Sequence, residues 1–380
     1  MAVMLAQSSA DRRKTRYPVV DGDIHPTLTS PRALDKYFLS DEWRQYHQTF
    51  GGRGFTGTNV PRTYPNAARR DAYPPNGGPA GSDLDFMRVQ LLDAWDVEYG
   101  ILQPLFGAAS MRNQEYSAAL SQAINEWQIA EWLDKEPRLR SGLGVPYENG
   151  PMSVAEIERR GRHPGFVQLL MAMRTSEPLG RPKYWPIYEA AEAYGLPLGI
   201  HVGGGGGVAV SGSGWPSYYI EDHTGQSVAF LTQVASFIFE GIFERFPKLK
   251  VVLIEGGFGW VPSLAWRMDA AWSKLRGEVP KLRRKPSEYF AEHFWLTTQP
   301  MEEPPVPHQF VQLLEQAPWL QDKLMFATDY PHWDFDAPDQ CLPDVELPEG
   351  FEEKLMCGNA RKLYGLTARV SGELSATAAG

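Results

Sequence analysis

Two short apolar segments, Leu196–Val202 (LPLGIHV) and Leu249–Glu255 (LKVVLIE), decide the fold, because a longer segment of helical period, Ser227–Phe246, lies between them. Continuous runs of Val, Ile and Leu without strict alternation are typical of parallel strands that are buried on both faces. Apolar residues that recur with a helical period are typical of a helix that covers such a sheet. The stretch therefore predicts one strand–helix–strand unit.

The same alternation continues on both sides of this unit. Six further apolar runs are candidate strands: Tyr17–Asp23, Tyr99–Gln103, Arg140–Pro146, Gly165–Met171, His293–Thr298 and Lys323–Thr328. Segments of helical period lie between them at Leu84–Trp95, Glu115–Leu133, Trp185–Tyr194, Val261–Leu275 and Val306–Gln316. About eight alternating units predict an α/β fold of the (β/α)8 TIM-barrel type. A doubly wound open sheet is the alternative, but no GxGxxG motif directly follows the first strand to favour it.

We expect one barrel domain over residues 17–367, with disordered ends at 1–16 and 368–380. Two connections are longer than the fold requires: Thr49–Asp83 after the first strand, and Gly203–Glu221 after the fifth. Long loops in compact domains are usually functional or disordered. In a barrel, both loops would rise from the carboxyl-terminal face, where substrates bind.

The composition excludes several classes of protein. The 37 Lys and Arg residues against 46 Asp and Glu residues give a net charge of −9, which argues against a nucleic-acid partner. No stretch approaches the roughly 18 uninterrupted apolar residues that would span a bilayer. Two cysteines are too few for a disulfide framework or a thiolate zinc cluster, so we expect a reducing, cytoplasmic location.

Acidic and imidazole side chains stand at the carboxyl ends of four predicted strands. Asp23 and His25 are two residues apart and would point to the same side of the first strand, where both could bind one cation. His201 ends the fifth strand. Each has a structural alternative, because Asp23 could cap a turn and His201 could be a buried histidine with its hydrogen bonds satisfied.

Glu255 and Asp329 end the sixth and eighth strands, and a buried carboxylate is costly unless it is paired or coordinated. The alternatives are a salt bridge from Glu255 to Arg267 and a turn at Asp329 before Pro331. Chance placement of all these groups at one end of one barrel is much less probable than any single alternative. The pattern predicts a cation site at the barrel mouth.

Five sequence pieces resemble a known family: DGDIH, LGIHVGG, FERFPKLKVVLIEGGFGWVP, LMFATDYPH and GNARKLYGL, spread over Val19 to Leu366. They resemble the amidohydrolase-related proteins, the branch of the amidohydrolase superfamily that includes aminocarboxymuconate-semialdehyde decarboxylase. The resemblance implies a TIM-type barrel with a divalent cation at the strand ends. We expect one or two ions of zinc, manganese or iron. The resemblance implies that the metal ligands are Asp23, His25, His201 and Asp329, to which we add Glu255.

Three positions depart from the pattern of that family. Asp23 stands where many relatives have histidine, and Glu255 stands where the decarboxylases have a histidine that acts as acid or base. The predicted strand Gly165–Met171 contains no lysine, so the carboxylated-lysine bridge of binuclear members is not expected. Asp329 and Glu255 are therefore the candidate acid/base groups, and His223 and His332 are candidate proton donors.

Three functions remain open on this basis. The first is a metal-dependent hydrolase or carbon–carbon lyase, similar to a decarboxylase, acting on a small carboxylated or cyclic substrate. The arginines of the first long loop could bind its carboxylate: Arg53, Arg62, Arg69 and Arg70. The resemblance also implies a possible homodimer.

The second is a non-haem di-iron monooxygenase on the same barrel, which three carboxylates would favour. A bulky apolar substrate would then contact aromatic residues at the mouth: Trp215, Tyr218, Tyr219, Trp260 and Trp333. The third is a non-catalytic scaffold, which the retained ligands make the least favoured.

Overall fold

The computed structural model describes residues 15–51, 67–106, 108–204 and 214–369. Its eight strands form one parallel sheet in which each strand pairs with the next along the chain. The strands are β1 (Val19–Ile24), β2 (Val97–Leu102), β3 (Leu139–Gly144), β4 (Phe166–Arg174), β5 (Leu198–Gly204), β6 (Val251–Ile254), β7 (Phe294–Thr297) and β8 (Leu324–Met325). Each overlaps one of the eight predicted segments, so the TIM-type barrel is confirmed and the doubly wound sheet is wrong.

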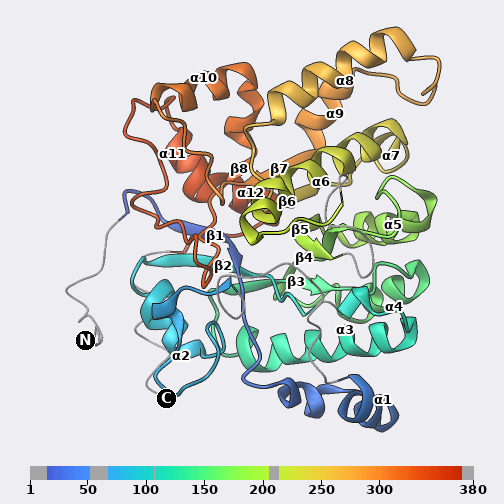
Figure 1. Ribbon diagram of the computed structural model, residues 1–380, viewed down its shortest axis with the longest axis vertical. Helices are drawn as coiled ribbons and strands as arrows, with labels where there is room; N and C mark the ends of the chain where they lie inside the picture. The colour runs from blue at the N-terminus through green and yellow to red at the C-terminus, as the bar shows by residue number, and fades with distance from the viewer. Residues whose placement is uncertain (1–14, 52–66, 107, 205–213, 370–380) are drawn as a thin grey trace.

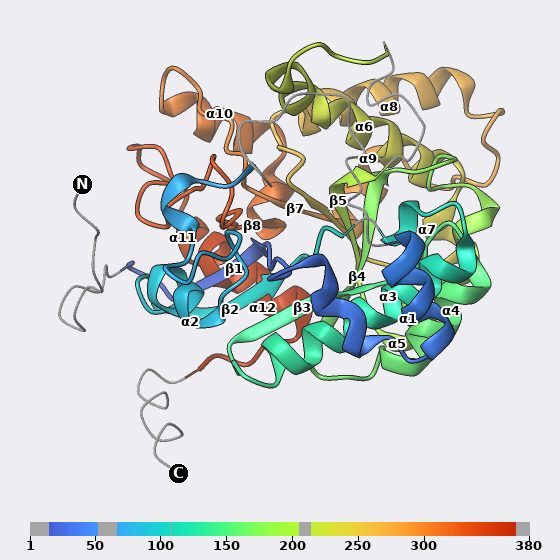
Figure 2. The ribbon, with the colours of Figure 1, turned by 60° about the horizontal axis from the view of Figure 1, so that its bottom comes forward.

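Helices surround the strands in both views (Figures 1 and 2). They are α1 (Asp41–Tyr46), α2 (Leu84–Met87), α3 (Gln114–Gln128), α4 (Gly150–Arg160), α5 (Trp185–Tyr194), α6 (Tyr219–Phe239), α7 (Ile242–Arg245), α8 (Val261–Leu275), α9 (Pro286–His293), α10 (His308–Gln316), α11 (Phe351–Glu353) and α12 (Asn359–Tyr364). The bounds of α5 and α8 agree with the prediction. None of the helices in the described part of the chain is long and apolar enough to cross a membrane.

The helix predicted over Ser227–Phe246 differs in its limits. It begins earlier, at Tyr219, and ends at Phe239. Gly241 follows with φ +73°, a left-handed conformation that separates α6 from α7. The loop after β5 is therefore shorter than predicted. Its residues 205–213 lie outside the described part of the chain, and so do residues 52–66 of the first long loop and the end segments 1–14 and 370–380.

The barrel closes between β1 and β8 through irregular contacts. Ile24 forms an isolated parallel bridge with Tyr330. The Gly22 amide donates to the Phe326 carbonyl at 2.9 Å, and the His25 amide donates to the Tyr330 carbonyl at 2.7 Å. We call this β1–β8 junction the seam. Because β8 is only two residues long, side chains add hydrogen bonds to it.

Asp21, the first residue of DGDIH, is the principal side chain of the seam. Its carboxylate is buried and accepts hydrogen bonds from the Thr328 amide at 2.9 Å and the Thr328 hydroxyl at 2.6 Å. Burial raises the pKa of Asp21 to about 7, although the Thr328 bonds act in the opposite direction. The motif therefore contributes to barrel closure as well as to the predicted site.

Replacing Thr328 by valine should lower the free energy of unfolding by about 1–3 kcal/mol, since one Asp21 oxygen loses its hydroxyl donor inside the protein. Chemical denaturation measures this loss. Thr328→Ser keeps the hydroxyl and is the matched control. Equal stability of the valine and serine variants would show that this hydrogen bond does not stabilise the seam.

Candidate metal centre

The predicted ligands meet at the carboxyl ends of the strands. His25 Nε2 lies 3.2 Å from Asp23 Oδ1 and 2.7 Å from Asp329 Oδ1. His201 Nε2 lies 3.4 Å from Asp23 Oδ2 and 3.3 Å from Glu255 Oε2. β1, β5, β6 and β8 therefore bring all five side chains into one cluster, although the residues are spread over most of the sequence.

The carboxylates of Glu255 and Asp329 enter the cluster through unusual backbone turns. Both residues have positive φ, +60° for Glu255 and +61° for Asp329. This left-handed conformation costs a side-chain-bearing residue about 1–2 kcal/mol. The backbone amide of Glu255 donates to Thr297 Oγ1 at 3.0 Å, and that of Asp329 donates to the Asp23 carbonyl at 3.1 Å. These bonds hold the two residues in this conformation. Strained backbone at converging polar side chains is typical of functional sites.

Backbone carbonyls fix the orientation of both strand-end imidazoles. His25 Nδ1 lies 3.0 Å from the Gln103 carbonyl, and His201 Nδ1 lies 2.8 Å from the Val202 carbonyl. A carbonyl can only accept, so each Nδ1 carries the proton and donates it. In the neutral form of each imidazole, Nε2 then presents a lone pair to the cluster, which is the tautomer that a metal-binding histidine needs.

Several buried atoms of the cluster have no hydrogen-bond partner among the residues that the structure describes. They are both carboxylate oxygens of Asp23, His201 Nε2, Glu255 Oε2 and Asp329 Oδ2. Acceptors that face one another in a buried site are stable only when a positive charge lies between them. Carboxylate oxygens and imidazole nitrogens are also ligands of zinc, manganese and iron. These residues therefore fit a divalent cation.

The electrostatics of the cluster lead to the same conclusion. Burial raises the pKa of Glu255 to about 8 and raises the pKa of Asp329 well above its ordinary value. Burial lowers the pKa of His25. It acts in the same direction on His201, but the nearby carboxylates of Asp23 and Glu255 raise the pKa of that imidazole to about 9. The buried carboxylates are difficult to ionise without a compensating positive charge, and a bound cation would supply that charge.

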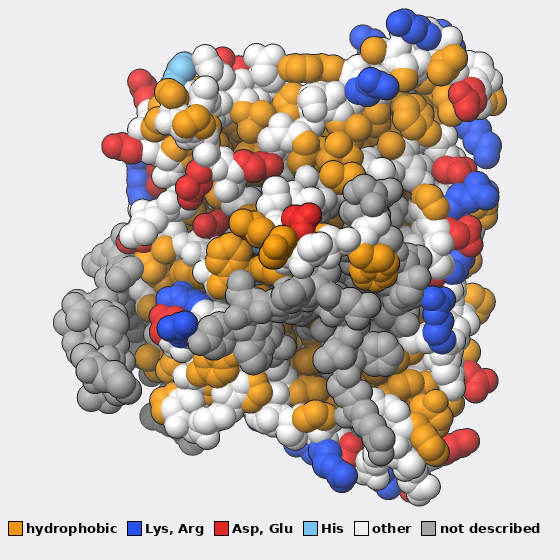
Figure 3. Space-filling view, viewed as in Figure 1, with side chains coloured by type: hydrophobic (Ala, Val, Ile, Leu, Met, Phe, Trp, Pro, Cys, Tyr) orange, Lys and Arg blue, Asp and Glu red, His pale blue; other side chains and the backbone are white. Residues whose placement is uncertain are grey.

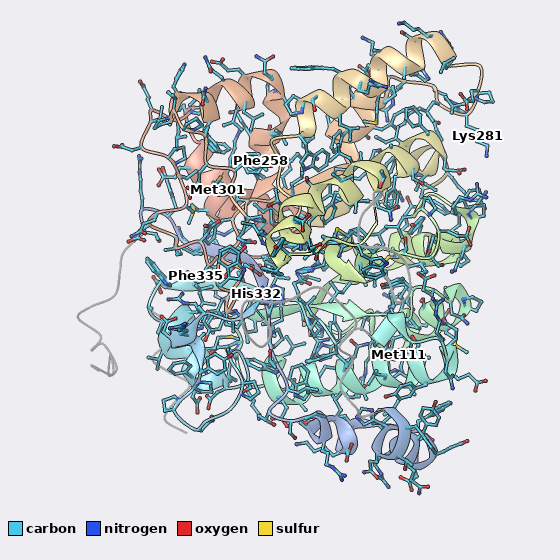
Figure 4. All side chains as sticks on the ribbon, viewed as in Figure 1. Met111, Phe258, Lys281, Met301, His332 and Phe335 are labelled. Carbon is cyan, nitrogen blue, oxygen red and sulfur yellow. The ribbon has the colours of Figure 1, made fainter. Side chains whose placement is uncertain are left out.

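His332 lies in the cluster, whereas His223 lies outside it. His332 Nδ1 is 2.7 Å from Asp329 Oδ1, and the His332 ring stacks on His25 with centroids 4.3 Å apart. Figure 4 labels His332 in the central part of the molecule. His223 Nε2, on α6, is instead 3.0 Å from Asp334 Oδ2. The predicted role of His223 therefore depends on a carboxylate that the sequence analysis did not identify.

Sequence reasoning also missed two further supporting groups. Gln103 orients His25, and Gln299 donates to Asp334 Oδ2 at 2.8 Å. Glu255 contacts His201 within the buried cluster, whereas Arg267 is exposed on α8, so the predicted alternative of a Glu255–Arg267 salt bridge is wrong. Gln103 and Gln299 each follow an apolar strand, a position that could have marked them.

The loop arginines give little support for a substrate anchor. Arg53 and Arg62 lie outside the described residues. Arg69 pairs with Asp71 at 2.6 Å and covers the Phe335 ring. Arg70 is exposed in the adjoining helical turn.

A mainly apolar cavity of about 240 Å³ borders His201. Its lining includes Phe106, Ile124, Val145, Leu170, Met171 and Val202. Of the predicted mouth aromatics, the Trp333 indole donates to Tyr219 Oη at 3.1 Å, whereas Trp260 stacks on Phe290. Trp215 and Tyr218 are exposed. On the face of the molecule drawn in Figure 3, apolar side chains lie near the middle, and Lys and Arg lie mainly at the edges.

Comparisons with known proteins agree with this architecture. The chain is 27% identical over 302 residues to gamma-resorcylate decarboxylase from a Polaromonas species, covering 75% of this chain and 88% of that protein. It is 26% identical over 289 residues to 2-amino-3-carboxymuconate-6-semialdehyde decarboxylase from Dictyostelium discoideum, covering 74% of this chain and 76% of the relative.

Solved structures share the fold. The 5-carboxyvanillate decarboxylase from Sphingomonas paucimobilis superposes with a TM-score of 0.66 at 24% identity, covering 92% of this chain and 99% of the other. A Polaromonas dihydroxybenzoic acid decarboxylase, with bound manganese and 2-nitroresorcinol, gives a TM-score of 0.65 at 21% identity, covering 93% and 98%. The amidohydrolase family model matches residues 20–366, almost the whole chain. The chain is therefore an enzyme of the hydrolase/lyase type with a buried site for a divalent metal, and it belongs to the amidohydrolase family.

Proposed function

We propose that the chain is a metal-dependent decarboxylase that removes carbon dioxide from a small, hydroxylated aromatic carboxylate. The observation that carries the proposal is the buried acid–imidazole cluster beside a mainly apolar cavity, which His201 borders. The similarity to two decarboxylases supports the reaction type.

The size of the cavity favours a substrate with one ring. Pockets for drug-sized ligands occupy about 300–1,000 Å³. The cavity of about 240 Å³ is smaller, and its lining of Ile124, Val145 and Leu170 suits the face of an aromatic ring. The ring would lie in this cavity, with its carboxylate toward the acid–imidazole cluster.

The reaction needs a proton at the ring carbon and a route for the departing carbon dioxide. A cation held by the cluster would supply positive charge that polarises a substrate oxygen. Asp329 is fully buried and has two oxygens, so one can face the cation while the other, beside His332, holds the proton that passes to the ring carbon. The bond between ring and carboxylate then breaks, its electron pair returns to the ring, and carbon dioxide leaves. His332 is bonded to the same Asp329 oxygen and is half-buried, so it can return a proton from solvent.

Glu255 and His223 have separate proposed roles. Glu255 takes the place of the acid/base histidine that the resemblance implies, and its unpartnered Oε2 faces His201. His223, held by Asp334, lies on α6 in contact with Trp333, where it can donate a proton to a group on the outer side of the substrate. Metal coordination by Asp23, His25, His201, Glu255 and Asp329 belongs to the same proposal.

A second candidate function is a di-iron monooxygenase. The observation that favours it is the presence of three carboxylates in two overlapping ligand groups that share His25 and Glu255. Turnover under strictly anaerobic conditions separates the two functions, because decarboxylation needs no oxygen. The cytoplasmic location and the homodimer stay predictions.

Removing the metal should abolish turnover, and adding manganese or zinc back should restore it. Protein treated with a chelator and dialysed would be incubated with hydroxybenzoates labelled with ¹³C in the carboxyl group, and labelled carbon dioxide would be measured. In D₂O the product should carry deuterium at the ring carbon that lost the carboxylate. Full activity of protein shown by elemental analysis to be free of metal would contradict the proposal.

A further inference from the structure

The ligand atoms form two overlapping groups of four. Asp23, His25, His201 and Glu255 make the first, and His25, Glu255, Asp329 and His332 make the second, with the ligand atoms of each group within 4.8 Å of one another. We infer that the centre holds two divalent cations, with Glu255 bridging them and His332 as a ligand of the second. This rests on the proposed cation site but not on the reaction that the site carries out.

His25 can serve only one of the two ions. Its Nδ1 donates to the Gln103 carbonyl at 3.0 Å, so Nε2 is its single ligand atom. The first ion, with Asp23, His25 and His201, has three protein ligands before Glu255 is counted. The second would have Glu255, Asp329 and His332, with positions left for water or substrate. Three protein ligands and an open position are typical of catalytic metal sites.

Buried oxygens without partners occur in both groups. Asp23 Oδ1 and Oδ2 belong to the first group, and Asp329 Oδ2 belongs to the second. Glu255, whose Oε2 also has no partner, belongs to both, and its side chain has two oxygens to share. Asp329 is fully buried and Glu255 is 6% exposed, so water cannot readily solvate these charges.

The charge of the cluster also favours two ions. Three carboxylates, Asp23, Glu255 and Asp329, carry three negative charges when they are ionised. One divalent cation leaves one uncompensated negative charge in a buried site, where water cannot readily solvate it. Two cations remove this uncompensated negative charge.

The experiment measures metal content directly. Apoprotein would be loaded with Mn²⁺, freed of excess metal, and examined by elemental analysis and electron paramagnetic resonance. Two ions per chain with an exchange-coupled spectrum are expected. His332→Ala should reduce the content to one ion and replace the coupled spectrum by that of isolated Mn²⁺, and Glu255→Gln should remove the coupling. His308→Ala, at an exposed histidine on α10, is the matched control.

A single isolated Mn²⁺ in the unmodified protein at saturating metal would overturn the inference, and this measurement needs no variant. The same would follow if His332→Ala retained two coupled ions. Release of carbon dioxide by a chain that holds one ion would leave the proposed decarboxylase intact while removing the second site. Absence of carbon dioxide release from a chain that holds two ions would contradict the proposed decarboxylase and leave the second metal site intact.

Discussion

The Asp329→Asn variant is expected to lose about 10³-fold in kcat, within the ~10²–10⁴ range of general acid–base groups. Asparagine keeps the shape of the side chain but cannot hold an acidic proton for the ring carbon. The hydrogen bond between His332 and residue 329 would also have an amide in place of the carboxyl group. Rates should be measured at saturating substrate and at metal concentrations that give the variant the same metal content as the unmodified protein.

The comparison for Asp329→Asn is Asp339→Asn, at an exposed position in the same carboxyl-terminal region. This control should keep the original kcat. If Asp329→Asn at equal metal content retained kcat within tenfold, Asp329 would not be the proton donor. Glu255, the other unpartnered carboxylate of the cluster, would then be the group to test.

The His201→Ala variant is expected to bind Mn²⁺ more than about 100-fold more weakly, since losing even a group that only supports a ligand costs 10–100-fold in metal affinity. Calorimetric titration of apoprotein measures this affinity. Heat denaturation gives an independent readout, because metal at 100 times its dissociation constant stabilises a protein by about 2.7 kcal/mol. The variant should lose most of this stabilisation at the same metal concentration.

An alanine at His308, which is exposed, should leave metal affinity unchanged. His201→Ala also enlarges the cavity that His201 borders, so the apoprotein's own unfolding has to be recorded. Unchanged Mn²⁺ affinity in a folded His201→Ala variant would place the cation elsewhere and would remove the basis of the proposed mechanism.

The sequence predicted the barrel and six of the clustered side chains because both depend on local patterns. A parallel strand buried on both faces is a continuous apolar run, and a ligand at its end is a polar residue directly after that run, as for His201 and Glu255. Helix α4 was not predicted, although Asn149 caps its first turn and Pro151 stands near its start. Its apolar residues are too few to give a clear period.

Contacts between distant segments could not be predicted in this way. The bond between His25 and the Gln103 carbonyl joins the ends of β1 and β2, and the His223–Asp334 pair joins α6 to the segment after β8. Positive φ at Glu255 and Asp329 also has no signal in their residue types, because these turns are imposed by the surrounding barrel. Tertiary geometry therefore determines which of the polar residues act together.

The irregular joint between β1 and β8 gives the cation a mechanical consequence. Asp23 and His25 lie on one side of that joint, Asp329 follows β8 on the other, and His201 lies across the mouth on β5. An ion held by these side chains links the two sides of the joint where the ladder of backbone hydrogen bonds is shortest. Chelation would therefore loosen the barrel first at this joint, so that ion binding adds to the stability of barrel closure.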